Sequence, residues 1–148
     1  MSAPSRDVVD LARGWIGTPY RHQCATRQAG TDCLGLIRGL WRELHGAEPE
    51  PVPGYSPDWG EPQGAELLWE AAARHLRPLP QGRPEHGDVL LFRMRSGTVA
   101  KHLGIAARRG SMPTVIHAYS GHGVIETPLT QPWSRRIVAR FRFPDEVK

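Results

Sequence analysis

The chain changes character near its middle, and this change limits the folds that it can adopt. From Arg6 to about Leu76, the apolar residues recur at helical spacing between loops. From about Gly87 to Phe143, they form short runs separated by turn-forming residues, as strands do. No helical pattern interrupts the second half, so we expect its strands to pair in sequence order as an antiparallel sheet. The sequence therefore predicts an α+β fold, with N-terminal helices packed on a C-terminal antiparallel sheet of about five to six strands.

Three helices are expected in the first half of the chain. The first covers residues 8–15, and the second runs from Asp32 to Leu44 with an apolar stripe along one side. Pro62 is well placed to begin the third, which continues to Leu76. Two stretches dense in proline, residues 47–64 and 77–87, are expected to be loops.

Short apolar runs mark the strands of the second half. The last run alternates cleanly between apolar and charged residues, which is typical of a half-buried strand. The expected strands are residues 88–92, 102–107, 114–119, 123–127 and 136–143.

The length and composition favour one folded domain. The 148 residues suit a single domain spanning 1–148, and 39% hydrophobic with 23% charged residues is typical of globular proteins. No apolar run approaches the roughly 18 residues that span a bilayer, so no membrane insertion is expected. The N-terminus lacks the apolar stretch and the cleavage site of a secretory signal. We therefore expect synthesis in the cytoplasm, and export only as part of a larger assembly.

Charge and cysteine content exclude several classes of function. The net charge is +4, and all but two of the 19 basic residues are arginines. They are scattered along the chain, which favours a solvated surface over a nucleic-acid interface, so no nucleic-acid partner is expected. Cys24 and Cys33 are too few for a disulfide framework and lack the close spacing of a zinc site, so no metal is expected. They are either one reactive thiol and a bystander, or two inert core residues.

Cys33 falls in the first turn of the second expected helix. Thr31 or Asp32, directly before it, can cap that helix. The positive end of a helix lowers the pKa of a thiol, and the thiolate is the nucleophilic form. Gly35, two residues on, leaves room for another backbone or for a substrate. A cysteine at a helix start is more often structural, so this feature alone does not assign a nucleophile.

Two of the seven histidines lie in apolar strands. These are His102 and His117, and the short connection between their strands folds the strands back on each other. Both imidazoles can then lie on one face, as a base and the group that orients it. Two hydrogen-bonded core histidines are the alternative. The others are expected at helix ends or in loops, with no assigned role: His22, His45, His75, His86 and His122.

Four ordered blocks of sequence carry a resemblance to a known family. The stretch GTPYRHQCATRQAGTDCLGLI resembles the catalytic signature of the NlpC-type cell-wall peptidases, a papain-like group. HGDVLLF (residues 86–92), KHLGIA (101–106) and VIHAYSGHGVIE (115–126) are similar to the family's later blocks. The resemblance extends from Val8 to Phe143 and implies a papain-like NlpC-type fold.

The resemblance assigns roles to individual residues. It implies that Cys33 is the nucleophile, His102 the general acid and base, and His117 the residue that orients His102. Tyr20 is implied to point its hydroxyl toward the oxyanion, beside the backbone N–H of Cys33. The remaining implied substrate-side positions are Asp32 and Leu34, and Leu34 replaces a serine that is frequent in the family. Cys24 is expected to be structural.

The resemblance also implies a reaction. A cysteine endopeptidase would cut peptidoglycan stem peptides, between D-glutamate and diaminopimelate, through a thioester and without a cofactor. The compact chain and its Cys-Leu-Gly variant resemble the peptidases of phage tails and gene transfer agents. That implies tail hub or baseplate partners, incorporation in a phage-like particle, and action in the periplasm or cell wall. The alternatives are a catalytically silent tail component, and an amidase or acyltransferase on the same fold.

Overall fold

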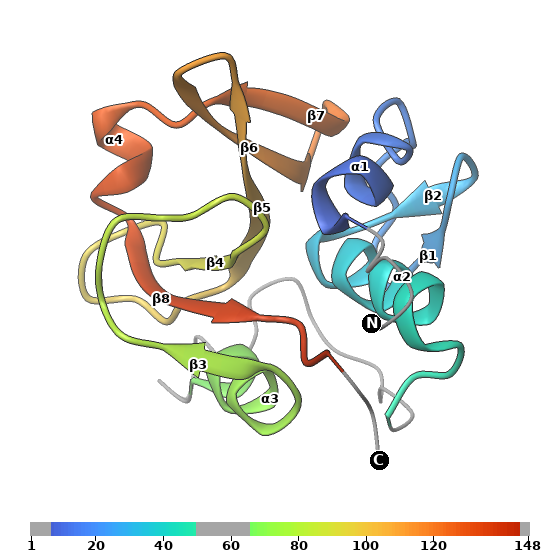
Figure 1. Cartoon of the computed structure of the whole chain (residues 1–148), viewed down its shortest axis with the longest axis horizontal. Helices are drawn as coiled ribbons and strands as arrows, with labels where there is room; N and C mark the ends of the chain where they lie inside the picture. Colours follow the sequence, from blue (N-terminus) through green and yellow to red (C-terminus); the bar gives the residue numbers. More distant parts are fainter. Residues whose placement is uncertain (1–6, 50–65, 146–148) are drawn as a thin grey trace, which may run out of the picture.

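The computed structural model describes residues 7–49 and 66–145 (Figure 1). The expected helix start at Pro62 and most of the expected loop at residues 47–64 lie outside the described residues.

The helices of the first half form close to where the sequence predicts them. They are α1 (Val8–Arg13), α2 (Cys33–His45) and α3 (Leu67–His75). Asp7 caps α1 by accepting a hydrogen bond from the backbone N–H of Val9 at 2.8 Å, because a carboxylate at this position satisfies a free donor of the first turn. A small hairpin, β1 (Ala25–Thr26) and β2 (Gly30–Thr31), leads into α2 and was not expected.

A single antiparallel sheet of six strands fills the second half. Its strands are β3 (Arg77–Leu79), β4 (Val89–Phe92), β5 (His102–Arg109), β6 (Met112–Tyr119), β7 (Gly123–Pro128) and β8 (Ile137–Arg142). The α+β fold class is therefore confirmed.

The order of the strands confirms one part of the prediction and corrects another. Strands β4 to β7 pair in sequence order, but the full order is β3-β8-β4-β5-β6-β7. The last strand therefore pairs with β4 and β3, and not with β7. A four-residue helix, α4 (Gln131–Ser134), stands in the connection from β7 to β8, so the expectation of no helix in this half is wrong.

Two local features explain these differences. Asp88, which is fully buried, accepts hydrogen bonds from Arg140 at 2.9 Å and Arg142 at 3.0 Å, which fastens β8 beside β4. β3 forms where a loop was expected because it is an edge strand, and an edge strand tolerates a proline such as Pro78.

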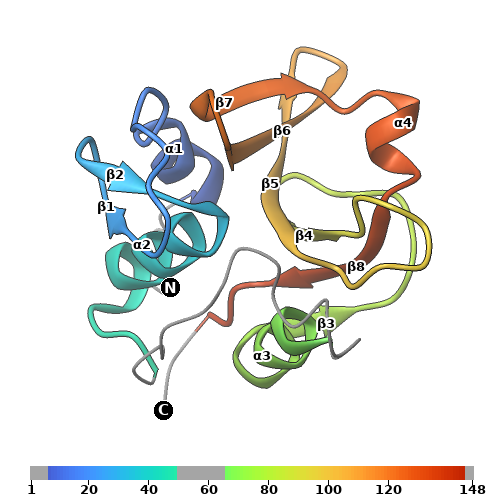
Figure 2. The same cartoon turned by 180° about the vertical axis from the view of Figure 1, so that it is seen from behind.

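The two faces of the sheet pack against different parts of the chain. The face with Leu91, Ile105 and Ile116 belongs to the same core cluster as α1 and α2. The other face, with Phe92 and Val115, packs against Trp133 of α4 in a smaller cluster. Figures 1 and 2 show α4 on the far side of the sheet from α1 and α2.

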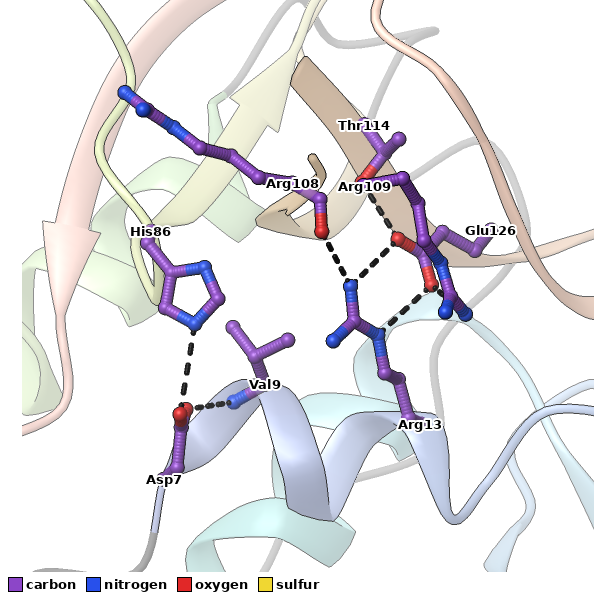
Figure 3. A network of polar contacts seen from close by, with 8 residues as sticks. All are labelled: Asp7, Val9, Arg13, His86, Arg108, Arg109, Thr114 and Glu126. Carbon is purple, nitrogen blue, oxygen red and sulfur yellow. Dashed lines mark hydrogen bonds and ion pairs between the residues drawn. The ribbon is translucent and has the colours of Figure 1, made fainter. Parts of the chain in front are cut away.

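A buried carboxylate ties α1 to the sheet. The Glu126 side chain, 6% exposed, lies 3.0 Å from Nε of Arg13 and 2.8 Å from Arg109, and it accepts the hydroxyl of Thr114 at 2.7 Å (Figure 3). Burial alone would raise the pKa of Glu126, but these three donors outweigh it and lower the pKa to about 2. Arg13 also donates to the carbonyl oxygen of Arg108 at 2.7 Å, so the first helix is held at two points.

Candidate active site

Cys33 lies at the head of α2, against the start of β5. Its sulfur is 3.8 Å from the carbonyl oxygen of Lys101, and the backbone N–H of Leu103 also contributes to its electrostatic environment. The sulfur therefore lies against the main chain directly before His102. β5 pairs with β6 only from Ile105 onward, so this end of β5 is left for the head of the helix.

The thiol and the imidazole share one pocket of about 150 Å³. Its walls come from the segment before α2, from the head of α2, and from the β5 and β6 ends that face it. The lining residues are Tyr20, His22, Asp32, Cys33, Met94, Lys101, His102, Ala118, Tyr119 and Ser120.

Asp32 builds the head of the helix. One carboxylate oxygen accepts the N–H of Gly35 at 2.7 Å, and the other accepts the N–H of Gln23 at 2.7 Å. The ring of His22 lies 3.7 Å from the second oxygen. Of the two residues that the sequence offered as caps, Asp32 is therefore the one that caps α2.

Gly35 is needed for a close approach of backbone. A Cβ at this position would collide with the carbonyl oxygen of Cys24 and would lie 2.5 Å from the hydroxyl of Thr31. Of the two uses that the sequence suggested for this glycine, the approach of another backbone is the one observed.

The pKa of the Cys33 thiol is raised to about 12. Burial is the main cause, since the residue is 7% exposed, and the neighbouring charge of Asp32 adds to it. The expectation that the helix start leaves this sulfur ionised is therefore wrong. The backbone N–H groups near the sulfur act in the expected direction but are outweighed.

The two strand histidines contact each other, as expected. Nε2 of His102 and Nδ1 of His117 are 2.8 Å apart. The pairing of Ile105 with Ile116 sets the register that places both rings on one face of the sheet. Gly104 lies beneath this contact, because a Cβ there would come within 2.6 Å of Val115 and 3.3 Å of the Cβ of His117.

Burial keeps both imidazoles neutral. It lowers the pKa of His102 to about 3, and the charge of His117 adds to this effect. It lowers the pKa of His117 to about 4, with a further contribution from His122. The other nitrogen of His117, Nε2, lies 3.2 Å from the hydroxyl oxygen of Thr127.

Aromatic rings enclose the histidine pair. Trp133 of α4 lies 5.8 Å from the ring of His102 and 5.1 Å from that of His117, between ring centroids. Phe92 and Tyr119 lie 5.7 Å and 5.9 Å from His102. Trp133 and Thr127 were not singled out in the sequence. The alternation of β7 places Thr127 on the face of His117, but Trp133 lies on a helix that the pattern does not reveal.

The other predicted site residues are only partly brought together. Tyr20 lines the pocket, and burial, followed by the charges of Cys33 and Asp32, raises its pKa to about 12. Leu34 is partly buried against the main core and does not line the pocket. Cys24 and Cys33 are both free cysteines.

Two further observations describe residues 7–49 and 66–145. In these ranges no group of three or more histidine, cysteine, aspartate or glutamate side chains could hold a metal ion. None of the helices that they form is long and apolar enough to cross a membrane.

The fold and the pocket define an α+β protein in which a cysteine at a helix head adjoins a histidine pair on an antiparallel sheet. The profile of the NlpC/P60 family matches residues 17–142. The chain belongs to this family, whose members are typically cysteine peptidases that act on the cell wall. No curated protein sequence matches the chain at a significant level.

Three solved structures, two of them from NlpC/P60 proteins, share the fold. An NlpC/P60 family protein from Bacillus cereus matches with a TM-score of 0.64 at 18% identity, over 97% of this chain and 41% of that one. A lipoprotein-like NLP/P60 protein from Staphylococcus aureus matches with a TM-score of 0.57 at 18% identity, over 91% and 39%. The structure of Ly7917 matches with a TM-score of 0.59 at 15% identity, over 96% and 63%. The chain thus spans less than two thirds of the length of these proteins.

Proposed function

We propose that the chain is a cysteine endopeptidase that hydrolyses amide bonds of peptidoglycan stem peptides, with Cys33 as nucleophile and His102 as base. The observation that carries this proposal is the shared pocket, in which the Cys33 sulfur lies 3.8 Å from the carbonyl oxygen of the residue before His102. Membership of a family of cell-wall peptidases supports the substrate class.

The charge states of Cys33 and His102 decide how the reaction begins. The thiol and the imidazole are both neutral near pH 7, since burial raises the thiol pKa to about 12 and lowers that of His102 to about 3. The thiol proton therefore moves to His102 as the sulfur attacks. Because Nε2 of His102 is engaged with His117, Nδ1 is the nitrogen that accepts this proton.

The remaining steps follow acyl transfer through a thioester. The sulfur forms a bond to the scissile carbonyl carbon, and the hydroxyl of Tyr20 and the N–H of Cys33 donate to the oxyanion. The C–N bond then breaks as protonated His102 gives its proton to the leaving amine. Water, deprotonated by His102, attacks the thioester and releases the carboxylic acid and the free thiol. His117 keeps the ring of His102 oriented throughout.

The proposal has two narrower parts, which are the bond that is cleaved and the assembly that carries the protein. The family resemblance supports cleavage between D-glutamate and diaminopimelate. We also propose that residues 1–148 form one domain that is carried on a phage-like tail or baseplate. The Cys33-Leu34-Gly35 sequence, similar to that of tail peptidases, supports this setting.

The test is digestion of purified muropeptides, with products identified by mass spectrometry. The expected result is a pair of fragments whose masses sum to the substrate plus one water, absent for Cys33→Ala and retained for the control Cys24→Ser. A product that gains an amine in place of water would identify an acyltransferase. Muropeptides left intact by the folded wild-type protein would refute the peptidase.

A further inference from the structure

The hydroxyl of Thr127 ends the hydrogen-bond chain that begins at His102. Its oxygen lies 3.2 Å from Nε2 of His117, whose Nδ1 lies 2.8 Å from Nε2 of His102. In the ladder between β6 and β7, Thr127 pairs with Val115, two residues from His117 and on the same face. The partly buried hydroxyl thus reaches His117 diagonally across two strands.

When His102 is charged, the positions of its protons determine the direction of each hydrogen bond between His102, His117 and Thr127. An imidazolium donates from both nitrogens, so Nε2 of His102 must then donate to Nδ1 of His117. A neutral His117 whose Nδ1 accepts carries its own proton on Nε2. That N–H points to Thr127, and the hydroxyl oxygen is the acceptor at hydrogen-bond distance.

The same arrangement suits the resting state. If His117 instead carried its proton on Nδ1, His102 would accept at Nε2 and carry its own proton on Nδ1. That form of His102 has no free nitrogen to take the thiol proton. When the Thr127 hydroxyl accepts the Nε2–H of His117, it stabilises the tautomer in which His102 can act as a base.

We propose that Thr127 is a positioning residue, whose hydroxyl oxygen accepts the Nε2–H of His117 and thereby holds His102 in its basic tautomer. The effect on rate rests on the proposed peptidase function, whereas the tautomer of His117 can be measured without it. Thr127 acts through His117 and does not line the pocket that holds the thiol.

Other titratable groups face the histidine pair, and the variants leave all of them in place. His122 acts on His117, and the pocket adds groups from α2, from the end of β6, and from the segments before α2 and β5. Arg136 lies over Trp133, 5.5 Å from its ring. The facing pocket groups are Tyr20, His22, Asp32, Cys33, Lys101 and Tyr119.

The experiment compares Thr127→Val, which keeps the shape but loses the hydroxyl, with Thr127→Ser, which keeps the hydroxyl. Thr114→Val is the matched control, since its hydroxyl donates to Glu126 on the opposite face of the same sheet. We expect Thr127→Val to lower kcat/KM on muropeptides about tenfold, the value of one hydrogen bond, and to shift the acid limb of its pH profile to lower pH. Thr127→Ser and Thr114→Val should retain the wild-type profile, each measured below its melting temperature.

Imidazole ¹⁵N chemical shifts give a readout that needs no turnover. His117 should be protonated on Nε2 in the wild type and in Thr127→Ser, and should lose this single tautomer in Thr127→Val. An unchanged pH profile and tautomer in Thr127→Val would overturn the proposal, as would a wild-type His117 protonated on Nδ1. Absence of cleavage by the wild type would refute the peptidase function alone, because the tautomer measurement would still decide the role of Thr127.

Discussion

The sulfur of Cys33 lies 3.8 Å from the carbonyl oxygen of Lys101, the residue directly before His102. The contact joins the first turn of α2 to the residue directly before β5 and keeps the thiol in the pocket that His102 lines. A carbonyl oxygen accepts a hydrogen bond from a thiol and repels a thiolate, so this contact favours the protonated sulfur. It agrees with the raised pKa and with a reaction that begins from a neutral thiol.

The first prediction concerns the reactivity of this thiol without substrate. Iodoacetamide reacts with thiolates, and burial and Asp32 raise the Cys33 pKa to about 12. We expect alkylation of Cys33 at pH 7.5 to be at least tenfold slower than that of a cysteine in an unfolded peptide. Mass spectrometry of tryptic peptides over time measures the rate, and Cys24→Ser removes the competing site.

Asp32→Asn provides a paired test of the cause. The amide oxygen can still cap Gly35, but the negative charge beside the sulfur is gone. Alkylation of Cys33 should therefore be faster in Asp32→Asn than in the wild type. Wild-type Cys33 reacting faster than the peptide cysteine would show that the site holds a thiolate before substrate is added.

The second prediction concerns acid stability through Glu126. Its folded pKa of about 2 lies below the ordinary value of 4.5, so ionised Glu126 stabilises the fold above pH 4.5. That contribution is lost as the pH falls from 4.5 toward about 2. Glu126→Gln should lower the free energy of unfolding by about 2 kcal/mol at pH 7 and by much less near pH 2.

Urea denaturation of both proteins across this pH range measures the difference. Subtracting the free energy of unfolding of Glu126→Gln from that of the wild type at each pH removes the effect of the remaining carboxylates. A difference between the two proteins that stays constant from pH 7 to pH 2 would contradict the ion-pair account of Figure 3.

The third prediction concerns Gly35. Alanine is a better helix former than glycine, which alone would stabilise α2. At this position, however, its Cβ would meet the backbone oxygen of Cys24, which cannot move without displacing the Asp32 N–H that donates to it. Gly35→Ala should therefore lose about 2 kcal/mol of stability, measured by thermal and urea unfolding. An unchanged or raised melting temperature would show that this loop yields without cost.

The sequence predicts most of the fold because its periodicity changes so clearly. Helical spacing locates α2, and the short turns of the second half locate β4 to β7 and their order. The position of β8 could not be obtained in the same way, since no local pattern reveals that Asp88 pairs with Arg140 across the sheet. β3 could not be predicted because its segment is rich in proline, which indicates a loop. An edge strand tolerates proline, whereas a central strand does not.

The candidate site, like the fold, could be predicted only in part. Motif order and strand alternation bring Cys33, His102 and His117 into view, and the contact between the two histidines follows from the hairpin. The ionisation of the thiol could not be inferred correctly, because the effect of a helix start was considered without burial and without the capping carboxylate. The resemblance implies a place for Leu34 beside the substrate, but a helix turns neighbouring side chains by about 100° and directs Leu34 to the core.

The last prediction concerns Trp133, which covers the histidine pair from α4. Its ring centroid lies 5.1 Å from that of His117, nearly perpendicular to it, and 5.8 Å from that of His102. Burial is the main cause of the low pKa of both histidines, so removing this ring should admit water and raise both values. We expect Trp133→Ala to move the two pKa values from about 3 and about 4 toward 6.5, as measured by NMR titration of the imidazole protons. Trp133→Phe retains an aromatic cover and should shift the two pKa values less. If both histidines of Trp133→Ala titrate as in the wild type, the low pKa values arise from the sheet itself and not from the cover that α4 provides.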